Sequence, residues 1–230
     1  MNAPILQLQN VGVKYRLKRK MSGSRYFWAV KDVSLDLHEG ESLGVLGSNG
    51  AGKSTLMKLI AGIISHDRGK MLRNDSMRFS LLSLGVGFES NLTGRENALM
   101  SGMLLGLHYQ TIAKRLGRIQ EFSELGDFFD QPIYTYSSGM ISRLGFSVAL
   151  ETEPDVLLLD EVFSVGDAAF QEKSAKALHE RFLGRKTVVL ISHDLHTIQR
   201  LCQSAVWINH GQTICSGTVE EVAQRYLSGV

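Results

Sequence analysis

The sequence predicts an α/β fold with antiparallel β elements and a helical insertion. Three runs are apolar at nearly every position and predict strands buried on both faces: 42–46, 156–159 and 187–191. Apolar and polar residues alternate at 6–9 and 33–37, which predicts strands with one buried face. Strand and helix signals alternate at both ends of the chain, whereas the stretch from about residue 92 to 150 is mainly helical.

Helical spacing and turn residues identify the other elements. Two sets of apolar residues recur at helical spacing: Leu56, Leu59, Ile60 and Ile63 after Lys53, and later Ile112, Leu116, Ile119 and Phe122. Residues 209–212 separate two apolar runs and predict a β-hairpin near the C-terminus. Thr218 and Glu221 form a capping-box pattern, so we expect a last helix to begin there.

The composition fits one soluble globular domain. The 230 residues are 43% apolar and 21% charged, which is enough to bury a core, and a formal net charge of +2 does not by itself indicate a nucleic-acid binder. The longest apolar window, 98–107, is far shorter than the roughly 20 residues of a membrane span. We expect a core at about 1–87 and 151–230 and a helical subdomain at about 88–150.

The N-terminus and the cysteines favour a cytosolic chain. Residues 1–4 lack the basic start and apolar run of a secretory signal. Cys202 and Cys215 match no metal-binding spacing, and Cys202 shares an expected apolar helix face with Leu195 and Ile198. We therefore expect both cysteines to be reduced packing residues.

A glycine-rich segment between a buried strand and an amphipathic helix matches the phosphate-binding pattern G-x-x-x-x-G-K-[ST]. Its residues are Gly47, Ser48, Asn49, Gly50, Ala51, Gly52, Lys53, Ser54 and Thr55. In such a loop, successive backbone N–H groups and the helix N-terminus face the phosphates. Lys53 is placed to reach the β and γ phosphates, and the Ser54 hydroxyl to ligate Mg²⁺. A glycine-rich turn that matches by chance would leave the flanking strand and helix unexplained.

Two carboxylates, Asp160 and Glu161, follow the buried run at 156–159. Open α/β sheets bind their ligands at the C-terminal ends of the strands. We expect Asp160 to hold Mg²⁺ through water, and Glu161 to orient or deprotonate the water that attacks the γ-phosphate. An acidic pair could instead cap a following helix, but the phosphate loop favours the catalytic interpretation.

Between these two sites an apolar helical stretch begins with Tyr136, Ser137, Ser138, Gly139 and Met140. In this context the segment resembles the signature of the nucleotide-binding subunits of ABC transporters, which stands at this distance before the strand that carries the carboxylates. Tyr136, Ser138 and Met140 replace the leucine, second glycine and glutamine of the family, while Ser137 and Gly139 match. The resemblance implies the ABC ATPase fold, with a P-loop NTPase (RecA-like) core.

A hydroxyl and a small residue at a helix N-terminus make a second anion site, and one γ-phosphate has no use for two such sites in one fold. The resemblance implies the explanation. Two copies pair head to tail as a homodimer, and Ser137, Ser138 and Gly139 of each copy close over ATP held by the phosphate loop of the other. A plain helix cap would account for Ser137 alone.

The resemblance implies further site residues. Gly166 and Asp167 stand in the dimer-contact loop, and His193 stands where the family has a switch histidine that hydrogen-bonds the γ-phosphate; an isolated histidine there would more often be structural. Tyr15, at the end of the first strand, is the family-like choice for stacking on adenine. Its nearby competitors are Tyr26, Phe27 and Trp28.

One position departs from the family pattern. The family places a glutamine, which senses the γ-phosphate and Mg²⁺, where the core meets the helical insertion. Within the corresponding stretch, 84–97, the stand-in is Glu89. A carboxylate repels ATP unless it binds Mg²⁺ or points away, so the glutamine's role does not carry over directly.

Four segments narrow the resemblance to ATPase subunits that export cell-surface polysaccharides: 84–88, 93–97, 136–140 and 160–167. These polymers are lipopolysaccharide O-antigen, capsule or teichoic acid. The resemblance implies two copies of this ATPase with two copies of a separate transmembrane permease, peripheral to the cytoplasmic face of the cell (inner) membrane, and no nucleic-acid partner. The helical insertion would dock on the permease. Because the sequence ends at Val230, we expect no C-terminal carbohydrate-binding domain.

Two other functions stay open. An importer ATPase differs mainly in the residues at 85–97 and 136–140. A soluble ABC ATPase that acts on ribosomes or DNA usually carries two cassettes or a coiled-coil insertion, and neither fits in 230 residues.

The segment 16–25 is a basic loop longer than a hairpin needs. Its cations are Arg16, Lys18, Arg19, Lys20 and Arg25. They form either a solvated face or a contact with anionic lipid headgroups, where each cation contributes about 1 kcal/mol.

Overall fold

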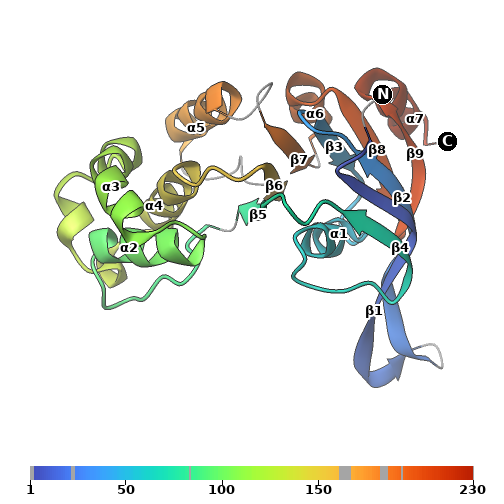
Figure 1. The fold of residues 1–230 in the computed structure, drawn as a ribbon, viewed down its shortest axis with the longest axis horizontal. Coiled ribbons are helices and arrows are strands. Elements are labelled where there is room, and N and C mark those ends of the chain that lie inside the picture. Colours follow the sequence, from blue (N-terminus) through green and yellow to red (C-terminus); the bar gives the residue numbers. More distant parts are fainter. Residues whose placement is uncertain are drawn as a thin grey trace. The chain divides into compact units, whose positions relative to one another are not determined.

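The computed structural model describes residues 3–21, 24–82, 84–160, 167–181, 186–192 and 194–229. The chain forms two compact units, here called the core unit and the helical unit (Figure 1). The core unit comprises Met1–Leu81, Asp155–Glu161 and Phe182–Val230, and the helical unit comprises Leu82–Pro154 and Val162–Arg181. Within the described ranges, no helix is both long enough and apolar enough to cross a membrane.

The core unit is built on a nine-stranded sheet with the strand order β4-β1-β2-β9-β8-β3-β7-β6-β5. Its strands are β1 Leu6–Met21, β2 Ser24–Leu37, β3 Ser42–Leu46, β4 Arg68–Arg73, β5 Phe79–Leu82, β6 Val156–Asp160, β7 Thr187–Ile191, β8 Ser204–Asn209 and β9 Gln212–Thr218. Parallel pairs join β8, β3, β7 and β6, whereas β1 pairs antiparallel with β2 and β4, and β8 with β9. The predicted α/β class with antiparallel elements is confirmed.

The central parallel strands are apolar along their whole length because both of their faces are covered. Every residue of β3 and of β7 is buried. Alternate side chains of the two strands share one core cluster with Leu56 and Ile60 of α1, Lys53–Ile60: Leu43 and Val45 of β3, and Val189 and Ile191 of β7. Since β3 and β6 both pair parallel with β7, their C-terminal ends reach the same edge of the sheet. That edge carries both the phosphate loop and Asp160.

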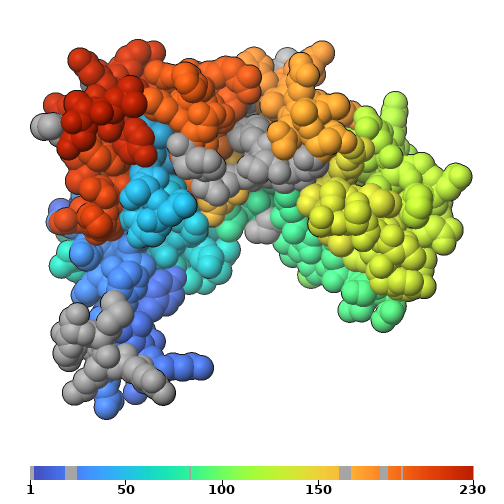
Figure 2. Space-filling view, turned by 180° about the vertical axis from the view of Figure 1, so that it is seen from behind, coloured from blue at the N-terminus to red at the C-terminus, as the bar shows by residue number. Residues whose placement is uncertain are grey.

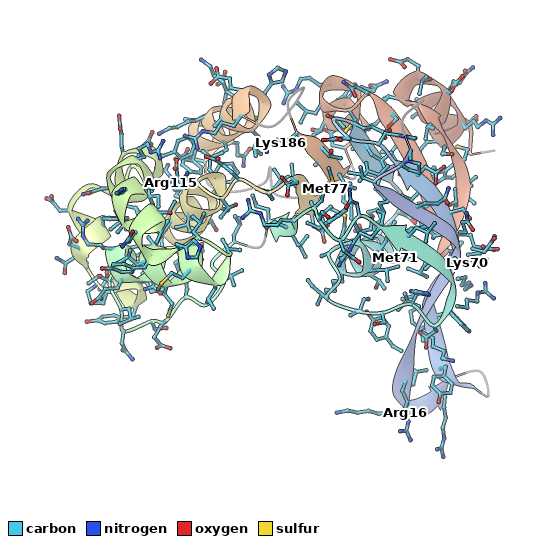
Figure 3. All side chains as sticks on the ribbon, viewed as in Figure 1. Arg16, Lys70, Met71, Met77, Arg115 and Lys186 are labelled. Atoms are coloured by element: carbon cyan, nitrogen blue, oxygen red, sulfur yellow. The ribbon has the colours of Figure 1, made fainter. Side chains whose placement is uncertain are left out.

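β1 and β2 continue past the other strands as a two-stranded ribbon (Figure 1), which forms a protrusion of the core unit when seen from behind (Figure 2). The described part of 16–25 is therefore strand. The loop predicted there from the sequence is wrong. Antiparallel pairing explains this, because the two strands bond each other along their facing edges and leave the groups on their outer edges to water. The ribbon's described cations are exposed, as both interpretations of this segment require: Arg16 (Figure 3), Lys18 and Arg25.

The C-terminal hairpin and helix form as the sequence predicts. β8 and β9 are joined by a two-residue turn at His210 and Gly211, whose φ angles of 45° and 77° suit the tight turn between two twisted strands. The last helix, α7 Val219–Ser228, begins at a capping box in which the side chains of Thr218 and Glu221 each bond the other's backbone N–H.

α6, Leu195–Leu201, begins after Asp194, whose carboxylate accepts the Thr197 N–H at 3.1 Å. Cys202 follows this helix, and both Cys202 and Cys215 are free thiols. Burial raises the pKa of the Cys202 thiol to about 12. The thiol therefore stays protonated and unreactive at neutral pH, as expected of a packing residue.

The helical unit surrounds a core of its own. Its helices are α2 Gly94–Leu104, α3 Tyr109–Ser123, η1 Gly126–Asp130, η2 Ile133–Thr135, α4 Ser138–Leu150 and α5 Ala168–Arg181. Its buried apolar cluster comprises Ala98, Ile112, Ile119, Leu125, Phe129, Ile133, Tyr136, Leu144 and Val148. The predicted helical spacing from Ile112 to Phe122 is that of α3.

Candidate functional site: a nucleotide pocket and a signature helix

The phosphate loop connects β3 to α1. Within it, the Ala51 N–H donates to the Ser48 carbonyl oxygen at 3.1 Å. Gly52 has a φ of 101°, and a Cβ there would lie 2.3 Å from the Ala29 carbonyl oxygen, so this position accepts only glycine. The turn delivers the chain to α1 with the helix N-terminus at the loop, which is the arrangement that binds phosphate.

The Lys53 ammonium lies inside the loop. It donates to the carbonyl oxygens of Gly47 at 2.8 Å and Ser48 at 3.0 Å, and the residue is only 6% exposed. An ammonium has three protons, so these two bonds leave one for a phosphate oxygen. Ser54, the next residue of α1, is exposed.

A pocket of 620 Å³ opens over the loop, within the size range of small-molecule sites. Its lining residues are Tyr15, Phe27, Ala29, Asn49, Gly50, Gly52, Lys53, Ser54, Thr55 and Asp160. The fold thus brings together three parts that lie far apart in the sequence: the phosphate loop, the carboxylate at the end of β6 and the aromatic residue at position 15.

Two aromatic residues, rather than one, line this pocket. Tyr15 and Phe27 are cross-strand partners on β1 and β2, and they are 41% and 44% exposed. Alternate residues of a strand face opposite sides. Tyr26 and Trp28 therefore face away, where the Lys14 ammonium lies 5.0 and 5.5 Å from their ring centres. Among the three competitors, the geometry favours Phe27. Its ring lines the pocket together with that of Tyr15.

The donor set beside the loop fits Mg²⁺. Ser54 brings a hydroxyl oxygen and Asp160 a carboxylate to the same pocket. Mg²⁺ prefers oxygen ligands and usually combines one or two protein groups with water and substrate phosphates. Ser54 and Asp160 therefore fit a metal that arrives with the nucleotide.

The predicted signature residues lie at the start of α4, in the helical unit. Ser137 is the N-cap, and its Oγ accepts the Met140 N–H at 3.2 Å. Ser137 and Ser138 are both exposed. Among the described residues, a Cβ on Gly139 would meet only the Ser137 Oγ, at 3.8 Å. Packing against the described part of the chain does not require glycine here, so its absent side chain leaves room for a ligand.

Asp167, the described residue of the predicted dimer-contact loop, is tied to the signature helix. Its carboxylate accepts the Phe170 N–H at 2.9 Å and pairs with Arg143 of α4 at 2.5 Å. The Phe170 N–H first, and the Arg143 charge second, lower the pKa of Asp167. Arg143 also pairs with Glu124 at 3.2 Å. The ionised Asp167 thus holds the start of α5 to α4.

Glu89 has an exposed side chain and a fixed backbone. Its N–H donates to Oδ1 of Asn97 at 2.7 Å, and its carbonyl oxygen accepts from Nδ2 of the same residue at 3.0 Å. Asn97 lies on α2 and is fully buried. One buried amide thus bonds both backbone groups of Glu89, whose carbonyl oxygen also accepts the Leu92 N–H at 3.1 Å.

Three predicted site residues lie outside the described residues: Glu161, Gly166 and His193. The strands that precede two of them are placed. Asp160, at the end of β6, is paired with Ile191, at the end of β7. The chain thus leaves both strands at neighbouring positions on the edge that carries the phosphate loop, and the three roles stay predictions.

Two residues of the site carry weaker signals in the sequence. Asn97 is a polar residue that precedes Ala98 on a helix face that is buried, and a buried amide needs hydrogen-bond partners. Arg143 has no local signal, because Glu124 and Asp167 lie 19 and 24 residues away along the chain.

A sequence profile of the family described as ABC transporter matches residues 30–164. The match includes the phosphate loop, the signature segment and Asp160. The chain belongs to the ABC transporter family. The resemblance drawn from the sequence is confirmed.

Curated relatives of this ABC protein are named as export subunits. The teichoic acids export ATP-binding protein TagH of Listeria monocytogenes serotype 4b (strain F2365) is 42% identical over 200 residues, which cover 87% of this chain and 59% of that protein. The O-antigen export system ATP-binding protein RfbB of Klebsiella pneumoniae is 41% identical over 206 residues, which cover 90% and 83%. The chain thus spans less than two thirds of TagH.

Solved ABC cassettes share the fold. The dimeric cassette MJ0796, in a post-hydrolysis state bound to ADP and Pi, has a TM-score of 0.75 at 22% identity, over 93% of this chain and 98% of that one. The ATP binding subunit of an ABC transporter has a TM-score of 0.77 at 22% identity, over 96% and 93%. At these identities the likeness concerns the fold alone, and it confirms the ABC ATPase fold predicted from the sequence.

Proposed function

We propose that this chain is the ATP-hydrolysing subunit of an ABC transporter that exports a lipid-linked cell-surface polysaccharide across the cytoplasmic membrane. The pocket in which Lys53, Ser54 and Asp160 meet beside two aromatic rings carries the ATP part of the proposal. Similarity to teichoic acid and O-antigen export subunits over 87% and 90% of the chain supports the polysaccharide part. An importer ATPase is the nearest alternative.

The pocket residues bind and orient ATP. The adenine stacks on the faces of Tyr15 and Phe27, and the backbone N–H groups of the loop and of the α1 N-terminus surround the phosphates. The third Lys53 proton bonds a β or γ phosphate oxygen. The ammonium there neutralises the negative charge that develops on these oxygens when the γ-phosphoryl group is transferred to water. Ser54 and Asp160 would hold Mg²⁺, which supplies further neutralisation of the β and γ oxygens.

Hydrolysis needs a positioned water, and Glu161 is the residue proposed to hold it. Glu161 directly follows Asp160, the carboxylate that is proposed to hold the metal. As a carboxylate it accepts a proton from the attacking water. The water oxygen bonds the γ-phosphorus, the bond from this phosphorus to the bridging oxygen breaks, and ADP and phosphate are released. His193 follows β7 and is proposed to hydrogen-bond the γ-phosphate.

A second copy of this chain completes each site. Ser137, Ser138 and Gly139 form an open group of hydrogen-bond donors and free space at a helix N-terminus. A head-to-tail homodimer places this group over the ATP of the other copy, with Gly166 and Asp167 at the contact. The dimeric cassette MJ0796 supports such pairing for the fold.

The permease is proposed to dock on the helical unit, at the cytoplasmic face of the membrane. Three large apolar side chains of α2 and of the start of α3 are exposed: Met103, Leu104 and Tyr109. A partner of this kind would cover them. We propose two ATPase copies and two permease copies in the assembly.

The ATPase part is tested with the permease reconstituted in lipid vesicles. We expect the wild-type chain to hydrolyse ATP in the presence of Mg²⁺. Glu161→Gln should still bind ATP but lose nearly all turnover, and should hold the dimer around unhydrolysed ATP. Normal turnover in Glu161→Gln would contradict the assigned base.

The export part is tested in cells. Deleting the gene should remove the surface polysaccharide and leave lipid-linked polymer inside, and the wild-type chain, but not Glu161→Gln, should restore the surface polymer. An intact surface with no internal polymer would refute export, and loss of uptake of a solute would support the importer.

A further inference from the structure

Arg68 reaches across β1 from the first position of β4. It is paired with Gly12 of β1, and its Nη2 donates a hydrogen bond to the carbonyl oxygen of Lys31 on β2. A Cβ on Gly12 would lie 2.8 Å from Cζ3 of Trp28 and 2.9 Å from Cγ of Arg68. Glycine at this position therefore leaves the space that both side chains occupy. Arg68 thus connects β4 to β2 over the strand that lies between them.

The Arg68 guanidinium also lies over the ring of Trp28. Its Cζ is 5.1 Å from the ring centre, and the Lys14 ammonium is 5.5 Å from the same centre. Arginine and lysine cations are attracted to the face of an aromatic ring. Trp28 is on the face of the ribbon opposite Tyr15 and Phe27, because alternate residues of a strand face opposite sides. Cations from β4 and β1 therefore hold the ribbon on the side away from the pocket.

The ribbon depends on such contacts because its strands have few partners. Pairing of β1 with β4 ends at Gly12, and β2 pairs with β9 at Asp32. Tyr15 and Phe27 lie beyond these positions, where the described strands pair only with each other. A two-stranded hairpin is at best marginally stable in water. The orientation of the two rings therefore depends on the side chains that hold the opposite face of the ribbon.

Lys31, whose carbonyl oxygen Arg68 bonds, is also tied to the phosphate loop. The Lys31 N–H donates to the Gly211 carbonyl oxygen at 2.7 Å, and the Gly211 N–H donates to the carbonyl oxygen of Ala51, in the phosphate loop, at 2.9 Å. One residue of β2 thus contacts Arg68 on one side and the turn that bonds the phosphate loop on the other. Phe27 lies only four residues before Lys31 on the same strand. The distance between the aromatic pair and the phosphate loop is therefore set at this part of β2.

We propose that Arg68 is a positioning residue for the bound adenine. It holds β2 at Trp28 and Lys31, and the strand in turn holds the aromatic pair at the distance from the phosphate loop that ATP requires. The inference rests on the proposed ATPase function. Arg68 is not one of the described residues that line the pocket, so it acts through Tyr15 and Phe27. A ligand that has the phosphates of ATP but no base should therefore bind equally well without Arg68.

The test compares the binding of ATP with that of inorganic tripolyphosphate, which lacks the base. Both are titrated calorimetrically into the full chain in the presence of Mg²⁺, and the wild type should bind ATP more tightly. Arg68→Met keeps most of the side-chain volume and removes the guanidinium. We expect it to weaken ATP binding about threefold to tenfold, the range of one net hydrogen bond, and to change tripolyphosphate binding by less than about twofold.

Arg73→Met is the matched control, because Arg73 lies on the same strand and makes the same kinds of contact. Its Cζ is 5.3 Å from the ring centre of Phe79, and its Nη1 donates to the Ile60 carbonyl oxygen at 3.4 Å. This variant should keep the wild-type affinity for both ligands, whatever its cost in thermal unfolding. An equal loss of ATP affinity in the two variants would overturn the inference, because the loss would then come from a general loosening of β4.

A double-mutant cycle shows whether Arg68 acts through the rings. Tyr15→Ala is made in the wild type and in Arg68→Met, and the loss of ATP affinity is measured in each. A ring that is no longer held in place has less to lose, so Tyr15→Ala should cost less in the Arg68→Met background. Losses that simply add would contradict the proposed role.

Gly12→Ala disturbs the same contacts by adding a methyl group where Trp28 and Arg68 lie, and it decides the question if Arg68→Met does not fold. It should weaken the binding of ATP and not that of tripolyphosphate, and an unchanged ATP affinity would overturn the inference. A wild type that binds the two ligands equally would also overturn it, while the phosphate site stands. A wild type that binds neither ligand would instead defeat the proposed function.

Discussion

Tyr15 and Phe27 face each other across β1 and β2, and both rings border the pocket above the phosphate loop. Each ring is partly exposed, as a surface that receives a planar ligand must be. The pair lies in the ribbon, just beyond Gly12 and Asp32, where β1 and β2 pair with β4 and β9. The proposed adenine site is thus shared by two strands, and this sets the first prediction.

Phe27→Ala should weaken ATP binding about as much as Tyr15→Ala. Loss of one base-stacking aromatic costs about 1–3 kcal/mol, which is roughly 5-fold to 150-fold in affinity. The measurement is titration with a fluorescent ATP analogue. Tyr26→Ala, the same truncation on the opposite face of β2, is the control and should stay near the wild type. Equal effects in Phe27→Ala and Tyr26→Ala would mean that the loss comes from strand pairing rather than from stacking.

The parts of the fold that are local in sequence could be predicted, and those that depend on distant partners could not. The phosphate loop can be predicted because its strand, glycines, lysine and helix follow one another within residues 42–60. Phe27 could not be chosen over Trp28 before the register of β1 against β2 was known. The sequence predicts a loop at 16–25 where the structure has strands, because basic residues there hide the alternation that marks a strand.

The helical unit shows the same division. α3 and α4 follow from apolar spacing, but the role of Asn97 depends on which carbonyl groups surround it. The sequence shows only that Tyr136 replaces the leucine of the family pattern. The fold shows that its hydroxyl lies next to Gly94. Residues whose partners lie on other elements therefore carry the information that sequence patterns miss.

Lys53→Ala should lower the affinity for ATP by about 10-fold or more. A hydrogen bond to a charged group contributes about 1.5–3 kcal/mol, and the variant also removes the ammonium that bonds the Gly47 and Ser48 carbonyl oxygens. Isothermal titration with ATP and Mg²⁺ measures the loss. Lys58→Ala, on an exposed position of α1, is the matched control. Similar affinities for both variants would remove Lys53 from the phosphate site.

Glu89→Gln should leave the fold intact and tighten the apparent affinity for ATP. Asn97 holds Glu89 by its backbone, which the substitution keeps, while the exposed carboxylate that would repel the phosphates becomes neutral. The half-saturating ATP concentration of the permease-stimulated ATPase should fall, with an unchanged unfolding temperature. If neither the rate nor the half-saturating concentration changes, Glu89 does not contribute.

Asp130→Asn should cost stability at pH 7, and this cost should shrink as the pH falls below 3.8. The hydrogen bond from Arg95 lowers the pKa of Asp130 below its ordinary value of 3.8. A group with a depressed native pKa stabilises the fold above its unfolded pKa, and this stabilisation disappears as the pH falls through the native pKa. Both side chains are exposed, so we expect a difference of at most about 1 kcal/mol at pH 7.

Urea unfolding at pH 7 and at about pH 3 measures this difference between Asp130→Asn and the wild type. Asp127→Asn changes the same net charge three residues earlier and keeps the bond to Arg95. A difference for Asp130→Asn that persists undiminished in acid would show that the bond does not depend on the charge of the carboxylate.

Glu151→Ala should destabilise the helical unit by about 3 kcal/mol. The substitution removes a buried carboxylate and leaves the arginines that pair with it close to one another. The Glu151 side chain is 4% exposed at the end of α4, where Arg118 lies at 3.1 Å, Arg181 at 2.9 Å and Arg115 at 3.8 Å. Three arginines from α3 and α5 thus meet on one carboxylate, and without it they repel one another.

The control for this cluster is Glu153→Ala, two residues away. Glu153 pairs with Arg115 at 3.3 Å but is 68% exposed, so its loss should cost less than about 1 kcal/mol. Thermal and urea unfolding of both variants compare the two positions directly. Equal costs would show that the arginines reach water freely and that Glu151 does not hold α3, α4 and α5 together. A large cost confined to Glu151→Ala would identify this carboxylate as the point where the helix after the dimer-contact loop is fastened to the signature helix.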